Sequence, residues 1–336
     1  MNLSIIGTGK IVCEALPVIA GTSGIAVRSI WSRPHSMSKA HSLAEQFCIP
    51  MVTADYAAVL ADSSVDTVYI ALINSVHYAF AYRALCAGKH VILEKPACLS
   101  LSELSALALE ARRRGLMLFE AVTLLHLPAF RLLRDELLPQ LGTIRHIECN
   151  YSQRSSRYDA YLCGEVLPAF DPAAGGGALM DINIYNLHFV IALFGLPSSA
   201  VYYCRRGFNG VDLSGTVVME YGQTSSSQSP FSLCTGAKDT DAPSFGLLQG
   251  DNGWLRIEGP VSTINGLTLC LNGSQPEEVP LPPLAHRLAP EFAAFADILS
   301  RRDFGSMNRL LDHSLSIMQT LDGLTSCHAA SPISSP

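Results

Sequence analysis

The fold class is indicated by the segment Leu3-Ser4-Ile5-Ile6-Gly7-Thr8-Gly9-Lys10-Ile11-Val12, which has the pattern of a buried strand, a glycine turn and a helix start. Gly7 can make the tight turn, and Gly9 lets the backbone approach a pyrophosphate at the partly positive start of the helix. The third position of this turn is the branched Val12 instead of a small residue. The segment predicts a nucleotide site, and an ordinary tight turn is the alternative interpretation.

Strands and helices alternate along the first part of the chain. Apolar runs predict strands at 3–6, 25–31, 65–72, 91–93 and 116–121, and helical patterns lie between them at 10–20, 38–47, 55–60, 77–87 and 99–114. This alternation predicts a doubly wound parallel sheet with right-handed crossovers. The chain has 336 residues, more than a typical domain of roughly 100–200, so two domains are expected, with the boundary after residue 120.

The second strand ends in Ser32-Arg33-Pro34-His35 and has no acidic residue there. Sites that prefer NAD use an acidic residue at this strand end to bind the ribose 2′-hydroxyl. The hydroxyl of Ser32 and the guanidinium of Arg33 suit a 2′-phosphate instead. We therefore predict that NADP(H) is favoured over NAD(H). In the alternative interpretation Arg33 is a solvated loop residue.

The strand at 91–93 leads directly into Glu94-Lys95-Pro96. Parallel sheets bind ligands at the carboxyl ends of their strands, so this charged segment is a candidate for chemistry. Taken alone, the segment would also fit a surface ion pair at a strand end.

The pattern changes beyond residue 120. A helix is expected at 128–138, a strand at 142–151 and a long polar and aromatic loop at 154–172. Alternating segments then predict a large antiparallel sheet whose exposed face is a surface for self-association. These strands are expected at 201–206, 215–221, 231–234, 245–249, 253–258 and 267–271, with a loop at 223–230, final helices at 291–299 and 307–324, and a frayed tail at 329–336.

A helix is expected to follow Gly175-Gly176-Gly177 and to end at Phe194. The glycine run would keep the start of this helix open to a ligand. Asp181, Tyr185 and His188 lie at i, i+4 and i+7, so in an α-helix they share one face. A substrate site and an internally satisfied hydrogen-bond trio are both consistent with this spacing.

The composition excludes several classes of protein. With 49% apolar and 15% charged residues the chain is not disordered, and no basic stripe suggests a nucleic-acid partner. The ten cysteines form no Cys-x-x-Cys pair, so neither a metal site nor a disulfide framework is expected. The apolar runs are shorter than the ~18 residues of a membrane helix, and the N-terminus lacks a signal-peptide pattern, so we expect a cytoplasmic protein.

Four motifs occur in order along the chain: Gly7-Thr8-Gly9, Asn74-x-x-His77, Gly88-Lys89-His90-Val91-x-x-Glu94-Lys95-Pro96 and Gly175-Gly176-Gly177-x-x-x-Asp181-x-x-x-Tyr185. The combination resembles the glucose-fructose oxidoreductase / inositol dehydrogenase (Gfo/Idh/MocA) family over nearly the whole chain. The resemblance implies a Rossmann domain at 1–120 and an α/β domain at 121–336 with an open antiparallel sheet. It also implies NAD(P)-dependent redox chemistry on a sugar, polyol or diol, and a homodimer or homotetramer built on that sheet.

The resemblance further implies roles for single residues. Lys95 matches the catalytic lysine and Asp181 the substrate-binding acid. Tyr185 stands where many members have histidine and where glucose-fructose oxidoreductase and dimeric dihydrodiol dehydrogenase have tyrosine. Departures from the pattern are Val12, Asn183, at a position that is often glycine, and Ile73, where proline commonly precedes the asparagine. The expected cofactor contacts are Gly7, Thr8, Gly9, Lys10, Ile11, Ser32, Arg33, Asn74, His77, Glu94 and Lys95.

The leading hypothesis is reversible hydride transfer between the nicotinamide and a carbonyl or alcohol carbon. Tyr185 would exchange the hydroxyl proton, Lys95 would stabilise the developing oxyanion, and Asp181 would orient the substrate or the lysine. The resemblance also suggests a cis bond before Pro96 that directs Lys95 towards the substrate. A non-catalytic cofactor-binding sensor is the alternative, supported by Val12. A biliverdin-reductase-like protein is a third interpretation, which does not call for the acid and the tyrosine as a pair.

Overall fold

The computed structural model describes residues 1–222 and 230–326, and the chain divides into two compact units. Residues 1–127 and 283–315 form the first unit, and residues 128–282 with the chain from 316 onward form the second. The sequence analysis expected a single boundary after residue 120, whereas here a segment from the C-terminal part joins the first unit. Its helix α9 (Ala289–Arg301) places Phe292 and Phe295 against Tyr69 and Phe119, with ring centroids 5.4 and 4.8 Å apart.

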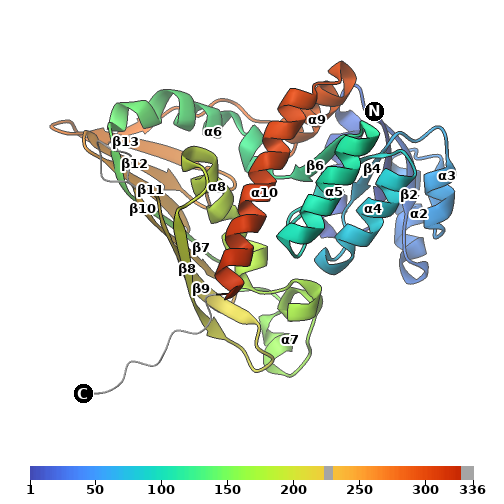
Figure 1. Ribbon diagram of the computed structural model, residues 1–336, viewed down its shortest axis with the longest axis horizontal. Coiled ribbons are helices and arrows are strands. Elements are labelled where there is room, and N and C mark those ends of the chain that lie inside the picture. Colours follow the sequence, from blue (N-terminus) through green and yellow to red (C-terminus); the bar gives the residue numbers. More distant parts are fainter. Residues whose placement is uncertain (223–229, 327–336) are drawn as a thin grey trace. The chain divides into compact units, whose positions relative to one another are not determined.

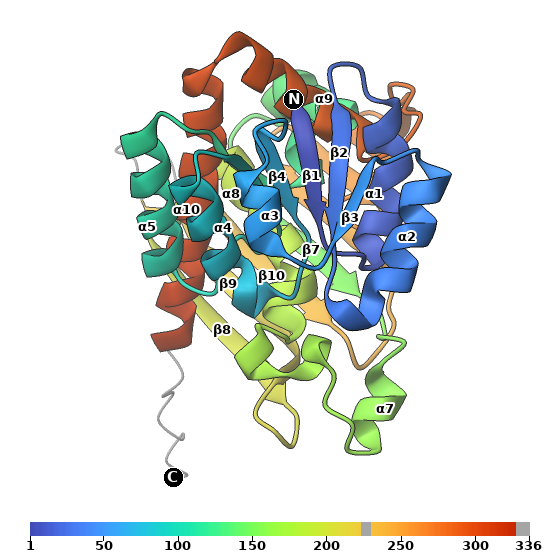
Figure 2. The same ribbon diagram turned by 90° about the vertical axis from the view of Figure 1, so that its right-hand side faces the viewer.

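The first unit contains a six-stranded, fully parallel sheet, as the alternation predicted. Its strand order is β3-β2-β1-β4-β5-β6, so the chain winds outward in both directions from the neighbours β1 and β4. Figure 2 shows β4, β1, β2 and β3 next to one another. The strands are β1 (Asn2–Ile6), β2 (Ala26–Trp31), β3 (Met51–Thr53), β4 (Thr67–Ile70), β5 (His90–Glu94) and β6 (Leu118–Ala121).

Strand β3 was not expected from the sequence. It has only three residues, all partly exposed, and pairs with the end of β2. Three residues are too few to show an alternating pattern, so the edge of the sheet is defined only by its pairing with β2.

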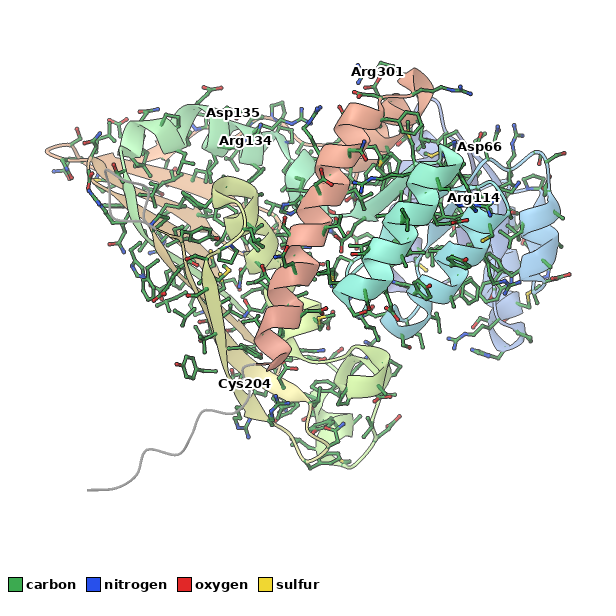
Figure 3. All side chains as sticks on the ribbon, in the orientation of Figure 1. Asp66, Arg114, Arg134, Asp135, Cys204 and Arg301 are labelled. Carbon is green, nitrogen blue, oxygen red and sulfur yellow. The ribbon has the colours of Figure 1, made fainter. Side chains whose placement is uncertain are left out.

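Helices connect these strands, and their ends follow from local chemistry. In α5 (Leu101–Arg114) the hydroxyl of the N-cap Ser100 accepts from the N–H of Glu103, and the Glu103 carboxylate accepts from the N–H of Leu99, one residue before the N-cap. At the other end Gly115 adopts the left-handed conformation, and Arg114, which is labelled in Figure 3, donates to the carbonyl of Cys86 at 3.0 Å. The other helices before the boundary are α1 (Lys10–Gly21), α2 (Met37–Gln46), α3 (Tyr56–Ala61) and α4 (His77–Cys86).

The second unit contains an eight-stranded sheet of order β14-β13-β12-β11-β7-β10-β9-β8. All neighbouring pairs are antiparallel except β7 and β10, which confirms the expected large, mostly antiparallel sheet. The short β14 was not expected. The strands are β7 (Ile144–Ser152), β8 (Ser199–Arg206), β9 (Asp212–Glu220), β10 (Phe231–Ala237), β11 (Phe245–Gly250), β12 (Gly253–Glu258), β13 (Gly266–Leu271) and β14 (Glu277–Val279).

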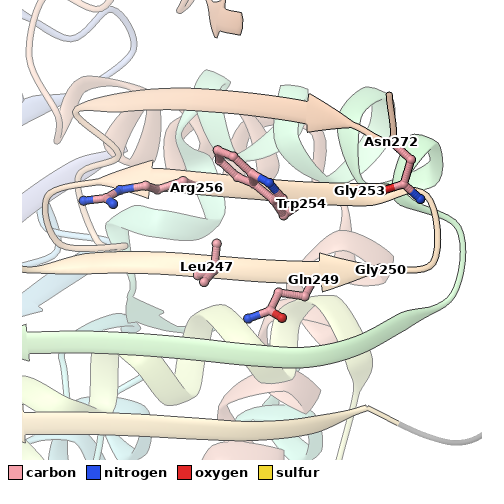
Figure 4. Close-up of a pocket in the computed structure, with 7 residues that line it drawn as sticks. All are labelled: Leu247, Gln249, Gly250, Gly253, Trp254, Arg256 and Asn272. Carbon is pink, nitrogen blue, oxygen red and sulfur yellow. The ribbon is translucent and has the colours of Figure 1, made fainter. Parts of the chain in front are cut away.

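One face of this sheet is covered by α8 (Ile184–Phe194), which lies against β7 and β10 (Figure 1). The other face carries a shallow hollow, where alternate residues of β11 and β12 project together. Figure 4 shows Leu247 and Gln249 from one strand and Trp254 and Arg256 from the next. The alternation of side chains along these strands, which the sequence showed, therefore places one set on the face covered by α8 and the other set on the open face.

The remaining expectations have mixed outcomes. The stretch 154–172 is not a featureless loop, because it contains α7 (Tyr158–Leu162) and the short turn η6 (Pro168–Phe170). The expected helix at 128–138 begins with α6 (Pro128–Leu132), and the last helices are α9 and α10 (Phe304–Ser326). The predicted loop at 223–230, apart from its last residue, and the predicted tail at 329–336 lie outside the described residues.

Among the described residues, one helical stretch, 172–194, has the length and apolar character to cross a membrane, but most of it is buried in the second unit, as expected for a core helix. Among the residues described here, nine cysteines are free and no group of three His, Cys, Asp or Glu side chains could hold a metal ion.

Candidate active site

The glycine turn between β1 and α1 has two glycines with different reasons to be there. Gly7 has φ +126° and donates its N–H to the carbonyl of Trp31, and a Cβ on it would lie 2.5 Å from the carbonyl oxygen of Ala71, the residue directly after β4. Gly9 precedes the helix start with φ −65°, and a Cβ on it would meet nothing within 4 Å. Gly7 is therefore required by the fold, whereas Gly9 leaves open space beside the backbone.

The residues beyond the turn are accessible, as the binding of a dinucleotide phosphate requires. Thr8, Lys10 and Ile11 are wholly or partly exposed, and helix α1 starts at Lys10, so its first N–H groups are presented beside Gly9. Val12 is fully buried, and the helix packs on the sheet with this branched side chain in its core. The departure at this position therefore leaves the turn intact.

Ser32 and Arg33, the two residues predicted to bind a 2′-phosphate at the end of β2, differ in exposure. Arg33 is exposed, as a phosphate-binding guanidinium needs to be. Ser32 is buried, its hydroxyl donates to the carbonyl of Arg33 at 3.1 Å, and its N–H donates to Thr53. Its hydroxyl therefore helps to shape the loop that carries Arg33.

The segment after β5 is held by the two residues that follow Lys95. The bond between Lys95 and Pro96 is cis, in line with the resemblance. The Pro96 carbonyl lies 3.0 Å from Nδ1 of His77, and the N–H of Ala97 donates to Oε1 of Glu120 at 2.8 Å. These contacts anchor the backbone directly after the lysine.

His77 is placed differently from a residue that contacts a cofactor. It is fully buried, and Nε2 lies 3.2 Å from the Leu72 carbonyl while Nδ1 lies on Pro96. Burial lowers the pKa of His77, and the hydrogen bonds to the backbone act in the opposite direction. Asn74 is partly exposed at the start of the turn η2 (Asn74–Val76). His77 thus connects the loops after β4 and β5.

Three carboxyl groups lie near one another in the first unit. The sequence analysis named Glu94 but did not predict that Glu120 and Glu291 lie close to it. Burial raises the pKa of Glu94, Glu120 and Glu291, and the charge of Glu94 raises the pKa of Glu291 further. The hydroxyl of Tyr69 donates to Oε1 of Glu94 at 2.5 Å, and Thr123 donates to Glu291 at 3.3 Å. An acidic residue inside the apolar run 116–121 was the one available signal for Glu120, and nothing local marks Glu291.

In the second unit the glycine run does not leave a helix start open, contrary to the expectation. Gly177 has φ +118°, and a Cβ there would clash with the carboxylate of Asp212 from β9. Asp212 accepts a hydrogen bond from the N–H of Leu179 at 2.6 Å and so occupies the start of the helical segment. Gly177 is therefore explained by the close approach of a capping carboxylate, and Gly176 by the backbone of Pro168, whose carbonyl oxygen would lie 2.5 Å from a Cβ.

The predicted polar face is only partly correct. The segment begins with a π-helical turn, η8 (Leu179–Asn183), before α8, so its residues do not follow a period of 3.6 throughout. The side chain of Asp181 is 42% exposed and Tyr185 is partly exposed, with its ring centroid 5.9 Å from that of Tyr151. His188 is fully buried, so it does not share their exposed surface.

Two asparagines of the same segment belong to the sheet contact. Asn183 is fully buried and donates to the Cys234 carbonyl at 2.7 Å, and Asn186 donates to the Thr235 carbonyl at 2.9 Å. A Cβ on Gly236 would lie 2.7 Å from that of Asn183, so the strand comes very close at this point. The departure at Asn183 therefore has a structural explanation.

Asp181 has a partner that the sequence analysis missed. Nζ of Lys238 lies 2.8 Å from Oδ2 of Asp181 and donates to the Ala169 carbonyl at 2.6 Å. No local pattern could have pointed to this lysine, because it lies 57 positions beyond Asp181 in the numbering. Lys95 belongs to the first unit and Asp181 and Tyr185 to the second, so their convergence stays a prediction.

Comparison with known proteins gives consistent matches. Residues 1–122 match the model of the oxidoreductase family with an NAD-binding Rossmann fold, and residues 139–256 match the GFO/IDH/MocA C-terminal domain. The uncharacterized oxidoreductase YgjR of Escherichia coli is 32% identical over 93% of this chain and 90% of its own length. The scyllo-inositol 2-dehydrogenase (NADP(+)) IolU of Bacillus subtilis is 34% identical over 66% of each chain.

A solved structure agrees with these matches. The 3-ketoreductase KijD10 of Actinomadura kijaniata, in complex with NADP and TDP-benzene, superimposes with a TM-score of 0.82 at 25% identity, over 97% of each chain. The two family models, the relatives and the parallel and antiparallel sheets lead to one conclusion. The chain belongs to the Gfo/Idh/MocA family of NAD(P)-dependent oxidoreductases.

Proposed function

We propose that this protein is an NADP(H)-dependent dehydrogenase or reductase that acts on a hydroxyl or carbonyl carbon of a sugar, polyol or diol. The observation that carries the proposal is the anchored segment at Lys95, held through Pro96 and Ala97 at the carboxyl end of β5. This is the edge of the parallel sheet at which the glycine turn also lies. The cofactor would supply or accept the hydride.

The roles of the protein groups follow from their chemistry. The ammonium of Lys95 would stabilise negative charge on the substrate oxygen, and the phenol of Tyr185 would donate or accept its proton. The partly exposed carboxylate of Asp181 would accept a hydrogen bond from a substrate hydroxyl. Glu94, which accepts from Tyr69, would orient Lys95 or the nicotinamide ribose. A sensor without turnover loses its support, because Val12 is accommodated in the core.

The preference for NADP(H) is supported by the exposed guanidinium of Arg33 at the end of β2. Among the similar proteins, IolU is named for NADP(+) and KijD10 was solved with NADP. The substrate class is supported in the same way, since IolU is named for an inositol, and pig trans-1,2-dihydrobenzene-1,2-diol dehydrogenase, named for a diol, is 31% identical over 55% of this chain.

We also propose self-association through the open face of the large sheet. Trp254 and Leu247 line its hollow, and Phe231 is 38% exposed on the neighbouring part of the sheet. Water contact with apolar side chains on a broad sheet face favours burial against a second copy. Substitution Trp254→Asp should reduce the molar mass measured by light scattering, and an unchanged mass would argue against this face.

The test of the function is a panel of sugars, inositols, diols and dicarbonyls, with NADP(H) or NAD(H) absorbance as the readout. Turnover with at least one member of the panel is expected, and it should be lost in Lys95→Met and Tyr185→Phe, while both variants bind NADP(H) nearly as the wild type does. A wild-type rate in either variant would reject its role. Cofactor binding without turnover on the whole panel would contradict the proposed function.

A further inference from the structure

Lys238 is a buried lysine without a role in the reaction proposed above. It follows β10 directly, and its side chain is 1% exposed. Lysine is almost never buried to this extent unless it is paired. Here the ammonium contacts the carboxylate of Asp181, the carbonyl of Ala169 and, at 4.7 Å, the ring of Phe170.

The backbone that carries this lysine is held from both sides. Its N–H donates to Leu213 of β9 at 2.8 Å, and its carbonyl accepts from Ser155 at 2.8 Å. The next residue, Asp239, is also buried and is bonded by Arg205. The long side chain therefore starts from a fixed point and ends on fixed partners, so the position of its ammonium is well defined.

Asp181 has the opposite exposure. Its side chain is 42% exposed, whereas the ammonium of Lys238 is enclosed by protein. The lysine therefore holds one oxygen of the carboxylate from inside, and the carboxylate presents its exposed part to solvent. An opposite charge at 2.8 Å favours the ionised form of the carboxylate.

We propose that Lys238 is a positioning residue, which keeps Asp181 ionised and aimed so that it can accept a hydrogen bond from a substrate hydroxyl. The inference rests on the proposed function, in which Asp181 orients the substrate. Lys238 touches no substrate itself, because protein covers its ammonium. It acts through the direction and charge of one carboxylate, and this predicts a substrate with a hydroxyl group that donates to Asp181.

A purely structural role makes a different prediction. If Lys238 only held Ala169 and Phe170, its loss would weaken the fold and would lower activity independently of Asp181. If Lys238 acts through Asp181, the two substitutions should not be additive, because each removes the same oriented charge. The pH dependence should also change, since the carboxylate loses the ammonium that favours its ionised form.

The experiment compares Lys238→Met, Asp181→Asn and the double variant, with a substrate that the wild type turns over. Lys238→Met should lower kcat/KM by about 10²-fold and shift the acidic limb of its pH profile to higher pH. Adding Lys238→Met to Asp181→Asn should lower kcat/KM little further. Arg134→Met, which removes a cation from the exposed pair with Asp135 in the same unit, should leave both readouts unchanged.

Folding is controlled in two ways. Asp181→Asn is the single variant most at risk of unfolding, because it leaves the buried ammonium of Lys238 without its carboxylate, and the double variant removes that charge. Melting temperatures of all three variants check that each is folded at the assay temperature. Lys238→Arg keeps the charge and should retain more activity than Lys238→Met. Fully additive losses, or an unshifted pH profile in a folded Lys238→Met, would overturn the inference while the proposed function stands. Absence of wild-type turnover on the whole panel would overturn the proposed function, and this inference with it.

Discussion

The hydroxyl of Tyr69, in the middle of the parallel sheet, donates a hydrogen bond to Oε1 of Glu94, the last residue of β5. Tyr69 is fully buried, and burial together with the charge of Glu94 raises its pKa well above the ordinary value, so it remains a protonated donor. A neutral side chain in the core of the unit thus holds the carboxylate that directly precedes Lys95.

Substitution Tyr69→Phe should therefore destabilise the fold by about 1–3 kcal/mol, because Glu94 loses a buried donor. It should also lower kcat, since Glu94 adjoins Lys95. Urea unfolding and initial rates measure the two effects. Tyr82→Phe in α4 removes the hydroxyl of a tyrosine that is 41% exposed, and it should change neither quantity. Equal behaviour of the two variants would show that the bond to Glu94 is unimportant.

The two glycines of the turn should respond differently to alanine. Gly7→Ala places a methyl group 2.5 Å from a carbonyl oxygen at φ +126°, so it should cost about 1–3 kcal/mol or more of stability. Gly9→Ala meets no protein atom within 4 Å, so the melting temperature should stay nearly constant. NADP(H) binding to Gly9→Ala should nevertheless weaken, as measured by fluorescence titration. Unchanged affinity would place the phosphates elsewhere.

Glu291 should make stability depend on pH. Its pKa in the folded state is raised by burial and by the charge of Glu94, so the folded protein holds this proton more tightly than the unfolded chain. Stability linked to Glu291 is therefore present below the ordinary glutamate pKa and is lost as pH rises towards the raised value. Glu291→Gln should melt above the wild type at pH 8, with a smaller difference at pH 5.

The comparison for Glu291→Gln is Glu165→Gln, which changes an exposed glutamate in the other unit. Glu165→Gln should have the same melting temperature as the wild type at both pH values. A melting difference for Glu291→Gln that did not grow with pH would mean that Glu291 is charged in the folded protein at little cost.

Arg33→Ala tests the cofactor preference. Loss of a charge-assisted contact to the 2′-phosphate should raise the dissociation constant of NADP(H) by about 10–100-fold and leave that of NAD(H) nearly unchanged. Arg28→Ala, in the strand β2 that precedes Arg33, removes a guanidinium that donates to Asn2, and it should alter neither constant. Equal losses for both cofactors in Arg33→Ala would argue against recognition of the 2′-phosphate.

The features that could be predicted from sequence are those that depend on neighbouring residues. The glycine turn, the alternation of strands and helices and the charged end of β5 are all local patterns, and the structure places each as a doubly wound sheet requires. Positions that depend on tertiary contacts were missed. His188 follows Tyr185 within α8 and is buried by the packing of that helix, and Asp212 reaches Gly177 from a strand more than thirty positions further along.

The same limit explains the residues around the candidate site. Nothing in the sequence near Glu291 shows that folding brings it close enough to Glu94 for their charges to interact, and nothing near Lys238 shows that it reaches Asp181. A buried charge is costly, so each such contact is a strong constraint once the fold is known. From sequence alone, the expectation for an acidic residue or a lysine is that it lies on the surface.

Helix α9 lies late in the chain but packs in the first unit, so the first unit cannot finish folding early in synthesis. Phe292 and Phe295 are synthesised after the whole eight-stranded sheet, yet they cover Tyr69 and Phe119 of the first-made sheet. Until Phe292 and Phe295 emerge from the ribosome, the aromatic side chains of Tyr69 and Phe119 in the first unit remain uncovered. A stalled chain that ends at residue 282 should bind an apolar dye or a chaperone there, and the full chain should not.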